Sequence, residues 1–480
     1  MTCRKPGTSR LCRAMAFLLC LCFLPAFAPA AAEDSAPALS VSVPKEVLGY
    51  SACTVTVTAP AAGEAELRLY DSIGNPWLIR RETLSAGKNE LSWDGLGANR
   101  ERLLVGPYRF DVILRGEDGT EYTASASFSI KNYKPALALA LPSSETLYLD
   151  GGENWFVECW VPTKCIVTME VLDQQDKIVY TKNYTLGDED KDIIRWDGTS
   201  GRKKLAPGDY TVRLYARTTP SFDWVYPLAI EETAPAPLAV GVTGTVIPDR
   251  DMSDEEIWEI MMKPSVVINA KGSSIRFPLR ESPDERSAVI AQLCCATQGL
   301  EVLSVEGDWA QVRAADYSNG QLVTGWYPLG ELTVYAPAPH YAVLVDKRDQ
   351  TLTVWQDGKP IGTVPVSTGL ATEARPEQET SPGAFLTDVH YSPDFAQDGV
   401  RYDYPLRYQG GNIIHSTGFI RIPHAAYSVK DYSKNLPLLG QKSSHGCVRV
   451  SPFASADCPI SSYWLWTHLP YHTRVIILDD

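Results

Sequence analysis

A cysteine preceded by a short polar run is the most reactive-looking feature of the sequence. The run reads Ser443-Ser444-His445-Gly446-Cys447-Val448-Arg449-Val450. A thiolate, not a thiol, attacks a carbonyl, and an unassisted cysteine is largely protonated at neutral pH. The sulfur therefore needs an imidazole within reach, and that imidazole needs a third group to fix its tautomer. Gly446 allows a sharp turn that leaves backbone amides free to stabilise an oxyanion.

All seven histidines follow residue 339, namely His340, His390, His415, His424, His445, His468 and His472. Two of them are candidates for the base. His424 is closer to Cys447 in sequence, but it follows Pro423 in a segment, 419–441, that reads as a loop. His415 ends an apolar strand and is followed by Ser416. An inserted loop lengthens the spacing at little thermodynamic cost, so we expect His415 to be the base.

The segment 340–480 resembles the L,D-transpeptidase catalytic domain. The resemblance is carried by Ser444-His445-Gly446-Cys447 with Arg449, by Ile414-His415-Ser416, and by the turn Thr380-Ser381-Pro382-Gly383. It implies that Cys447 is the nucleophile, that His415 carries its proton, and that the Ser416 carbonyl orients His415.

The same resemblance implies further roles around the nucleophile. The amides of Gly446 and Cys447 receive the oxyanion, and Ser444, His445 and Arg449 shape the site and position the donor peptide. A tyrosine upstream of the base often assists in this family, and Tyr404 and Tyr408 are the two candidates in this sequence.

The implied reaction is a two-step acyl transfer on peptidoglycan stem peptides, without a cofactor or metal. Cys447 attacks the bond between the residue at stem position 3 and D-Ala at position 4, and a second stem's amine then completes a 3→3 cross-link. Water as acceptor gives an L,D-carboxypeptidase instead, and the sequence does not choose between them.

Two other functions compete with this hypothesis. A zinc peptidase using His415, His424, His445 and Cys447 lacks a ligand signature such as His-Glu-x-x-His. A wall-binding protein with little activity is the other, in which the modules preceding residue 340 carry the function.

Residues 1–32 read as a secretory signal. Arg4, Lys5, Arg10 and Arg13 precede an apolar run from Ala14 to Ala28, and small residues end at Ala32. The run is too short for a spanning helix, and no later segment qualifies, so we expect export to the cell wall without a stable membrane span. The remaining chain has 40 basic and 58 acidic residues, which disfavours nucleic acid and anionic lipid as partners.

The elements that position the site are predicted to be mainly β and multidomain. Trp93-Asp94-Gly95 with Gly106-Pro107-Tyr108 recurs as Trp196-Asp197-Gly198 with Gly208-Asp209-Tyr210. This repeat, with alternating apolar and polar residues, predicts two Ig-like β-sandwiches at 33–133 and 134–233.

A linker at 234–263 follows, with a short helix that a capping box at Ser253 and Glu256 begins. Strands between 264 and 336 resemble a small SH3-like barrel, and 340–480 forms a β-rich catalytic domain.

Seven cysteines remain after residue 32, so at least one thiol lacks an intrachain partner. Cys159 and Cys165 are predicted to form a local disulfide, and Cys294-Cys295 to be strand residues. A bridge between Cys447 and Cys458 is the alternative that removes the nucleophile.

Overall fold

The computed structural model describes residues 38–150, 155–187, 192–219, 222–270, 276–294, 296–388, 390 and 394–480. The predicted signal at 1–32 and Cys295 lie outside these residues. The described chain is mainly β and is divided into several sheets, as predicted. None of its helices has the length and apolar character that a bilayer crossing requires.

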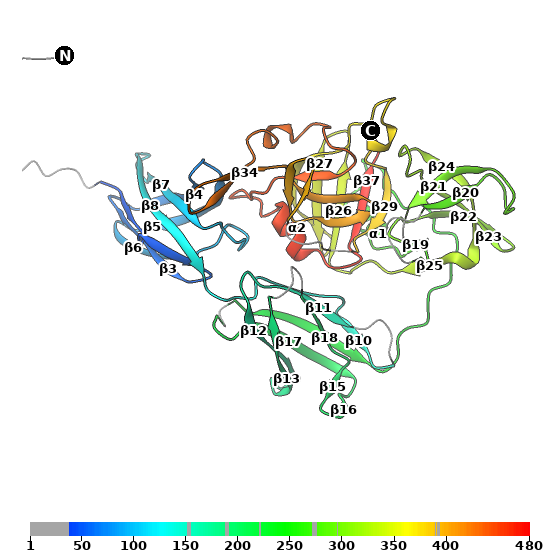
Figure 1. Ribbon diagram of the computed structural model, residues 1–480, viewed down its shortest axis with the longest axis horizontal. Helices are drawn as coiled ribbons and strands as arrows, with labels where there is room; N and C mark the ends of the chain where they lie inside the picture. The colour runs from blue at the N-terminus through cyan, green and yellow to red at the C-terminus, as the bar shows by residue number, and fades with distance from the viewer. Residues whose placement is uncertain are drawn as a thin grey trace, which may run out of the picture.

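The first unit is a sandwich of two sheets (Figure 1). One sheet has the strand order β1-β3-β6, with bounds Ser40–Ser42, Cys53–Ala59 and Gly87–Trp93. The other has the order β2-β8-β7-β4-β5, with bounds Glu46–Gly49, Glu121–Tyr133, Gly106–Gly116, Gly63–Asp71 and Pro76–Leu84. Alternate residues of β4 and β7 are buried between the sheets, which is the period of a half-buried strand.

The second unit repeats this strand order. The sheet β9-β11-β14 has bounds Leu139–Pro142, Phe156–Trp160 and Asp192–Arg195. The sheet β10-β18-β17-β12-β13 has bounds Thr146–Tyr148, Trp224–Glu231, Gly208–Ala216, Cys165–Leu172 and Ile178–Leu186. A short hairpin, β15 (Thr199–Ser200) with β16 (Lys203–Lys204), is added at its edge.

The repeated motifs make equivalent contacts in the two sandwiches. The indole N–H groups of Trp93 and Trp196 each donate to the carbonyl three residues on, at 2.8 Å. The hydroxyls of Tyr108 and Tyr210 each donate to the carbonyl four residues back, at 2.8 and 2.9 Å. The sequence repeat therefore reflects a structural repeat, and the assignment of the two sandwiches as Ig-like stays a prediction.

The predicted disulfide between Cys159 and Cys165 is wrong, because both thiols are free. Cys159 lies on β11 and Cys165 on β12, which belong to opposite sheets of the second sandwich. Both side chains are buried in the core between those sheets. They behave there as small apolar residues.

The third unit is a small β structure. Its five-stranded sheet has the order β21-β20-β24-β23-β22, with bounds Val289–Cys294, Arg276–Arg280, Leu322–Pro328, Trp309–Ala315 and Glu301–Glu306. A second pair joins β19 (Ser265–Ile268) to β25 (Leu332–Tyr335), after the 3-10 turn η2 (Leu329–Glu331). Cys294 is a strand residue, as predicted.

The last unit is built on an eight-stranded, barrel-like sheet of order β29-β37-β26-β27-β28-β36-β33-β32. The bounds are Gly383–Leu386, Arg474–Leu478, Tyr341–Asp346, Thr351–Gln356, Lys359–Ser367, Val448–Val450, Asn412–Ser416 and Leu406–Gln409. Two hairpins accompany it, β30 (Asp394–Gln397) with β31 (Val400–Asp403), and β34 (Ile420–Pro423) with β35 (Ser428–Asp431). The remaining elements are α2 (Ser462–His468), η3 (Pro376–Gln378) and η4 (Leu436–Leu438).

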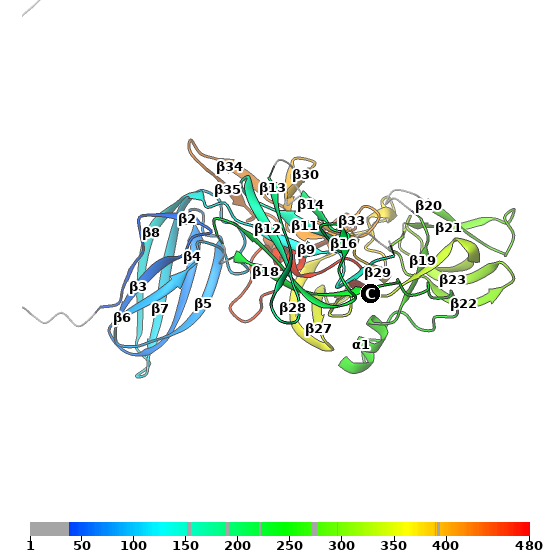
Figure 2. The same cartoon turned by 90° about the horizontal axis from the view of Figure 1, so that it is seen from below.

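The expected loop at 419–441 is only partly irregular. The hairpin β34–β35 occupies its first half, and η4 lies in its second. The hairpin lies against the first sandwich in both ribbon views (Figures 1 and 2). Asn75 of that sandwich donates to the Lys430 carbonyl at 2.8 Å. The strands are short and form in contact with a neighbouring unit, which local sequence does not reveal.

The linker helix α1 (Asp254–Met261) begins at Ser253 with the predicted capping box. Its apolar residues pack on the last unit's sheet, in a cluster that includes Ile260, Trp355 and Ile476. The Arg474 guanidinium on β37 donates to the Met261 carbonyl at 2.9 Å and also to Ser265 and the Lys263 carbonyl. The helix is thereby fixed to the last unit at its otherwise unsatisfied C-terminal end.

Candidate active site

Two parallel strands bring the two sequence motifs together. Strand β33 pairs with β36 so that His415 is opposite Arg449. Cys447 immediately precedes β36, and its sulfur accepts a hydrogen bond from the Ile413 backbone. Residues two apart on a strand point to the same face of a sheet. Ile413 and His415 therefore share a face, and Cys447 lies next to Ile413.

His415 is held in one tautomer. Its Nδ1 lies 2.6 Å from the carbonyl oxygen of Ser416, so Nδ1–H donates and Nε2 keeps its lone pair. The predicted bond to Ser416 is present. The side chain is only 2% exposed. Burial lowers the pKa of His415 to about 3, partly opposed by this hydrogen bond. The imidazole is therefore neutral at physiological pH and available as a proton acceptor.

Cys447 is a free, half-buried thiol. The alternative bridge to Cys458 is absent, since Cys458 is also free. Burial raises the pKa of Cys447, while the Ile413 backbone and the Arg449 guanidinium lower it. At neutral pH the Cys447 side chain is consequently a thiol, and the imidazole of His415 on the neighbouring strand is neutral.

Tyr402 on β31 completes the immediate surroundings of the base. Its ring meets the ring of His415 edge to face, with centroids 4.6 Å apart. Phe395 on β30 also meets His415 edge to face at 5.6 Å and stacks on Tyr402. Arg449 lies over the Tyr402 ring at 5.7 Å. Sequence reasoning missed Tyr402, because an upstream tyrosine has no motif of its own.

The turn before Cys447 depends on glycine. Gly446 has a φ of 112°, and a Cβ there meets the Asn412 side chain at 2.6 Å. Thr380 donates to the Gly446 carbonyl at 2.9 Å, and Tyr408 donates to the same oxygen at 3.4 Å. In a trans peptide the following N–H points the opposite way. The Cys447 amide is therefore turned away from Thr380 and Tyr408.

The two amides of the predicted oxyanion pair differ in their hydrogen bonds. The Gly446 amide donates to the Ser444 hydroxyl at 3.2 Å, so it is already used. That hydroxyl also donates to the Cys447 carbonyl at 2.6 Å. For the Cys447 amide, the part of the chain that the structure describes offers no acceptor. Of the predicted pair, the Cys447 amide is therefore the one left available to a bound group.

Comparison with known protein families identifies the last unit. Residues 340–477 match the family model described as YkuD, the L,D-transpeptidase catalytic domain. These residues are an L,D-transpeptidase catalytic domain. The match does not extend to the units before residue 340, and no curated protein matches the chain.

Several solved L,D-transpeptidases are similar in part. One from Xylanimonas cellulosilytica is 22% identical, with 29% of this chain and 60% of that chain covered and a TM-score of 0.20. One from Mycobacterium smegmatis is 15% identical, covering 57% and 92%, with a TM-score of 0.23. One from Mycobacterium tuberculosis H37Rv is 18% identical, covering 43% and 98%, with a TM-score of 0.22. The family match carries the assignment, because these TM-scores are low.

The other predicted site residues near Cys447 are Tyr408, Ser444 and His445. Tyr408 is buried beneath the turn at Gly446, to whose carbonyl its hydroxyl donates. Ser444 is 1% exposed with its hydroxyl occupied, so it shapes the turn and cannot contact a peptide. His445, which precedes Gly446, is exposed.

Tyr404 does not belong to the site, which corrects the prediction. Its φ is 57°, which turns its side chain out of the alternation of the strand. Its ring packs against Tyr463 and Trp466 of α2 instead, at 4.8 and 5.6 Å. The competing base His424 is exposed at the tip of hairpin β34–β35, where it stacks on Tyr427 at 4.4 Å.

Among the described residues there is no group of three or more histidine, cysteine or acidic side chains placed to hold an ion.

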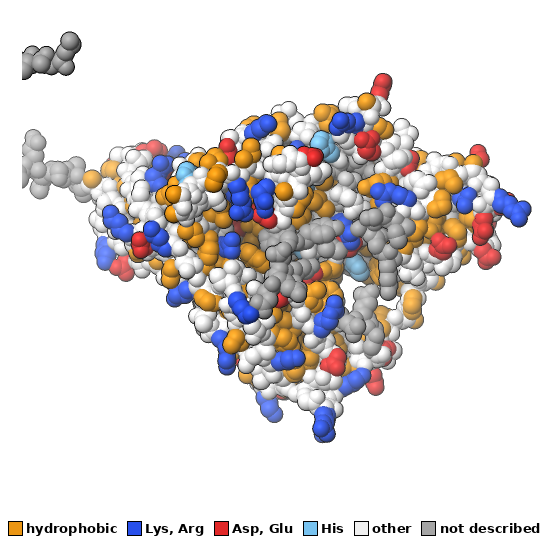
Figure 3. All heavy atoms as spheres, viewed as in Figure 1, with side chains coloured by type: hydrophobic (Ala, Val, Ile, Leu, Met, Phe, Trp, Pro, Cys, Tyr) orange, Lys and Arg blue, Asp and Glu red, His pale blue; other side chains and the backbone are white. Residues whose placement is uncertain are grey.

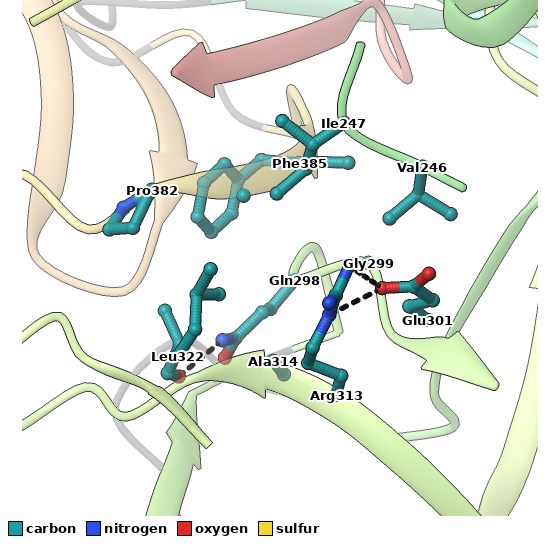
Figure 4. Close-up of a pocket in the computed structure, with 13 residues that line it drawn as sticks. Val246, Ile247, Gln298, Gly299, Glu301, Arg313, Ala314, Leu322, Pro382 and Phe385 are labelled. Carbon is teal, nitrogen blue, oxygen red and sulfur yellow. Dashed lines mark hydrogen bonds and ion pairs between the residues drawn. The ribbon is translucent and has the colours of Figure 1, made fainter. Parts of the chain in front are cut away.

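Figure 4 shows a cavity between the third unit and the L,D-transpeptidase domain, with Pro382 and Phe385 facing Gln298 and Leu322. It measures only about 10 Å³, room for a single water.

Proposed function

We propose that this protein is an exported enzyme that transfers acyl groups between peptidoglycan stem peptides through a thioester on Cys447. The observation that supports this most strongly is the oriented imidazole of His415, fixed through Ser416, beside a free thiol at a glycine turn. The family match to 340–477 supplies the substrate class.

In the first step the sulfur attacks the carbonyl carbon of stem residue 3. As the C–S bond forms, the thiol proton passes to Nε2 of His415, and the oxyanion accepts a hydrogen bond from the Cys447 amide. The intermediate collapses, the bond to D-Ala breaks, and His415 returns the proton to the departing amine. A thioester remains on Cys447.

In the second step an amine from another stem attacks the thioester and gives its proton to His415. The C–S bond then breaks, the departing sulfur takes the proton back from His415, and the new amide is the 3→3 cross-link. No nucleotide is consumed, because the thioester retains the energy of the cleaved amide. Arg449, close to both reacting side chains, adds positive charge where the oxyanion develops.

Figure 3 shows acidic and basic side chains interspersed over one face, without a large basic area. That surface and the acidic chain suit a wall peptide better than a polyanion.

Incubation of the mature protein with purified muropeptides, followed by mass analysis, tests the proposal. Release of D-Ala with formation of dimers supports a transpeptidase, and release without dimers supports a carboxypeptidase. Cys447→Ser and His415→Ala should both abolish D-Ala release. His424→Ala is the matched control and should keep it. Loss of activity in His424→Ala alone contradicts the assignment of the base.

A further inference from the structure

The segment between base and nucleophile joins the L,D-transpeptidase domain to the first sandwich. Besides the bond from Asn75 to the Lys430 carbonyl, aromatic rings continue from one unit into the other. Trp77 of the sandwich meets Phe453 edge to face at 5.1 Å and Tyr432 at 6.5 Å. Phe419, Tyr432 and Phe453 are part of the same apolar cluster as the sandwich core.

The buried carboxylate of Asp403 accepts hydrogen bonds from polar side chains of this segment. Lys430 Nζ donates to Asp403 Oδ2 at 2.7 Å, and the Tyr432 hydroxyl donates to the same oxygen at 2.6 Å. Asp403 is 1% exposed and Lys430 8%. A buried ion pair is a weak source of stability, but its directional bonds favour one arrangement of the elements that carry it.

Asp403 is adjacent to the groups that hold the base. Its backbone N–H donates to the Ser416 hydroxyl at 2.8 Å, and Ser416 is the residue whose carbonyl orients His415. Asp403 also directly follows Tyr402, whose ring lies against His415. Through these two contacts, the position of Asp403 sets both the hydrogen-bond partner and the ring neighbour of the imidazole.

We propose that the first sandwich is a working part of the active site and that Asp403 is the positioning residue through which it acts. The sandwich fixes Lys430 and Tyr432 by way of Asn75 and Trp77. These two hold Asp403, which places Tyr402 and Ser416 around His415. The inference rests on the proposed function, and it gives a role to a unit that lies outside the family match.

The same interface offers a matched control. Arg81 of the sandwich pairs with Asp457, and these side chains are 55% and 71% exposed. The pair joins the same two units but has no contact with Asp403. Removing this ion pair weakens the contact between the two units but leaves the contacts of Asp403 with Tyr402 and Ser416 unchanged.

The test compares Asp403→Asn, Asn75→Ala and Arg81→Ala in the full chain, with kcat and KM for D-Ala release measured across pH. Asp403→Asn should lower kcat about 10- to 100-fold with KM changed little, because a displaced base slows the chemical step more than binding. Asn75→Ala should lower kcat in the same direction, and Arg81→Ala should match the wild type. Thermal melting identifies any variant that fails to fold, and Lys430→Met then replaces it.

A second readout does not need peptidoglycan. The rate of alkylation of Cys447, followed by peptide mass analysis, should fall near neutral pH in Asp403→Asn. At about pH 10 it should approach the wild-type rate, because the thiolate then forms without the base.

If the wild type releases no D-Ala, the proposed function is wrong. The alkylation rates of wild type and Asp403→Asn then still test the role of the first sandwich. An unchanged alkylation profile and kcat in Asp403→Asn, or an equal loss in Arg81→Ala, overturns the role of the sandwich.

Discussion

The rings of Tyr402 and His415 meet edge to face at 4.6 Å, so Tyr402 is a tyrosine in direct contact with the candidate base. Tyr404, two residues on, is turned away by a positive φ and packs on α2. Strand β31, which carries Tyr402, therefore ends before Tyr404. A substitution at each should separate their roles.

We expect Tyr402→Ala to lower kcat for D-Ala release by about tenfold, because His415 loses the ring that restricts its orientation. Tyr404→Phe keeps the ring that packs on α2 and should retain wild-type activity. Steady-state kinetics on muropeptides measures both. Equal activity of wild type and Tyr402→Ala would remove Tyr402 from the site.

Thr380 is expected to act through the Gly446 carbonyl that it holds at 2.9 Å. Thr380→Val removes this donor and lets the Gly446–Cys447 peptide rotate, so kcat should fall about 10- to 100-fold. Thr380→Ser retains the hydroxyl and should restore most of the activity. KM should change little in either variant, and a loss confined to KM would contradict this role.

Stability should depend on pH through His415. The pKa is about 3 in the folded protein and about 6.5 in an unfolded chain. Below pH 6.5 the unfolded chain binds a proton that the folded protein does not, so the free energy of unfolding decreases as pH falls toward 3. Between pH 7 and 5 the loss is roughly 2 kcal/mol.

His415→Asn lacks this group, so denaturant unfolding should show a smaller loss for the variant over the same pH range. The other titrating groups contribute equally to both proteins and cancel in the difference. Parallel curves for wild type and variant would show that His415 is not buried as a neutral group.

Arg474 should matter for stability and not for chemistry, because its guanidinium binds the carbonyls at the end of α1. Arg474→Met leaves those carbonyls without donors and should lower the free energy of unfolding of the catalytic domain by about 2–4 kcal/mol. Ser253→Ala, which removes the cap at the other end of the helix, should cost about 1 kcal/mol. Urea titration measures both, and a neutral Arg474→Met would mean that the helix is held elsewhere.

The sequence predicted those features that have a local signature. The paired Trp-Asp-Gly and Gly-x-Tyr motifs predicted two equivalent units, because each indole and phenol bonds backbone within four residues. The capping box predicted the start of α1 for the same reason. His415 and its bond to Ser416 were also accessible from the motif.

Features that depend on contacts between distant segments were missed. Strands β34 and β35 form against the first sandwich, so their sequence reads as a loop. The Gly446 amide was expected to be free because nothing local shows the Ser444 hydroxyl turning back to it. Tyr404 and Tyr408 were the candidates from sequence and Tyr402 was not, because the sequence does not reveal that a positive φ at Tyr404 turns its side chain away.

The proposed reaction requires an acyl group carried on Cys447, and trapping that group is the most direct test. The protein is mixed with a tetrapeptide stem, quenched in acid, digested and mapped by mass spectrometry. We predict that the peptide containing Cys447 gains the mass of the stem without D-Ala, and that the gain is absent in Cys447→Ser and His415→Ala. Release of D-Ala with no adduct on Cys447, or with the adduct on another cysteine, would contradict the account.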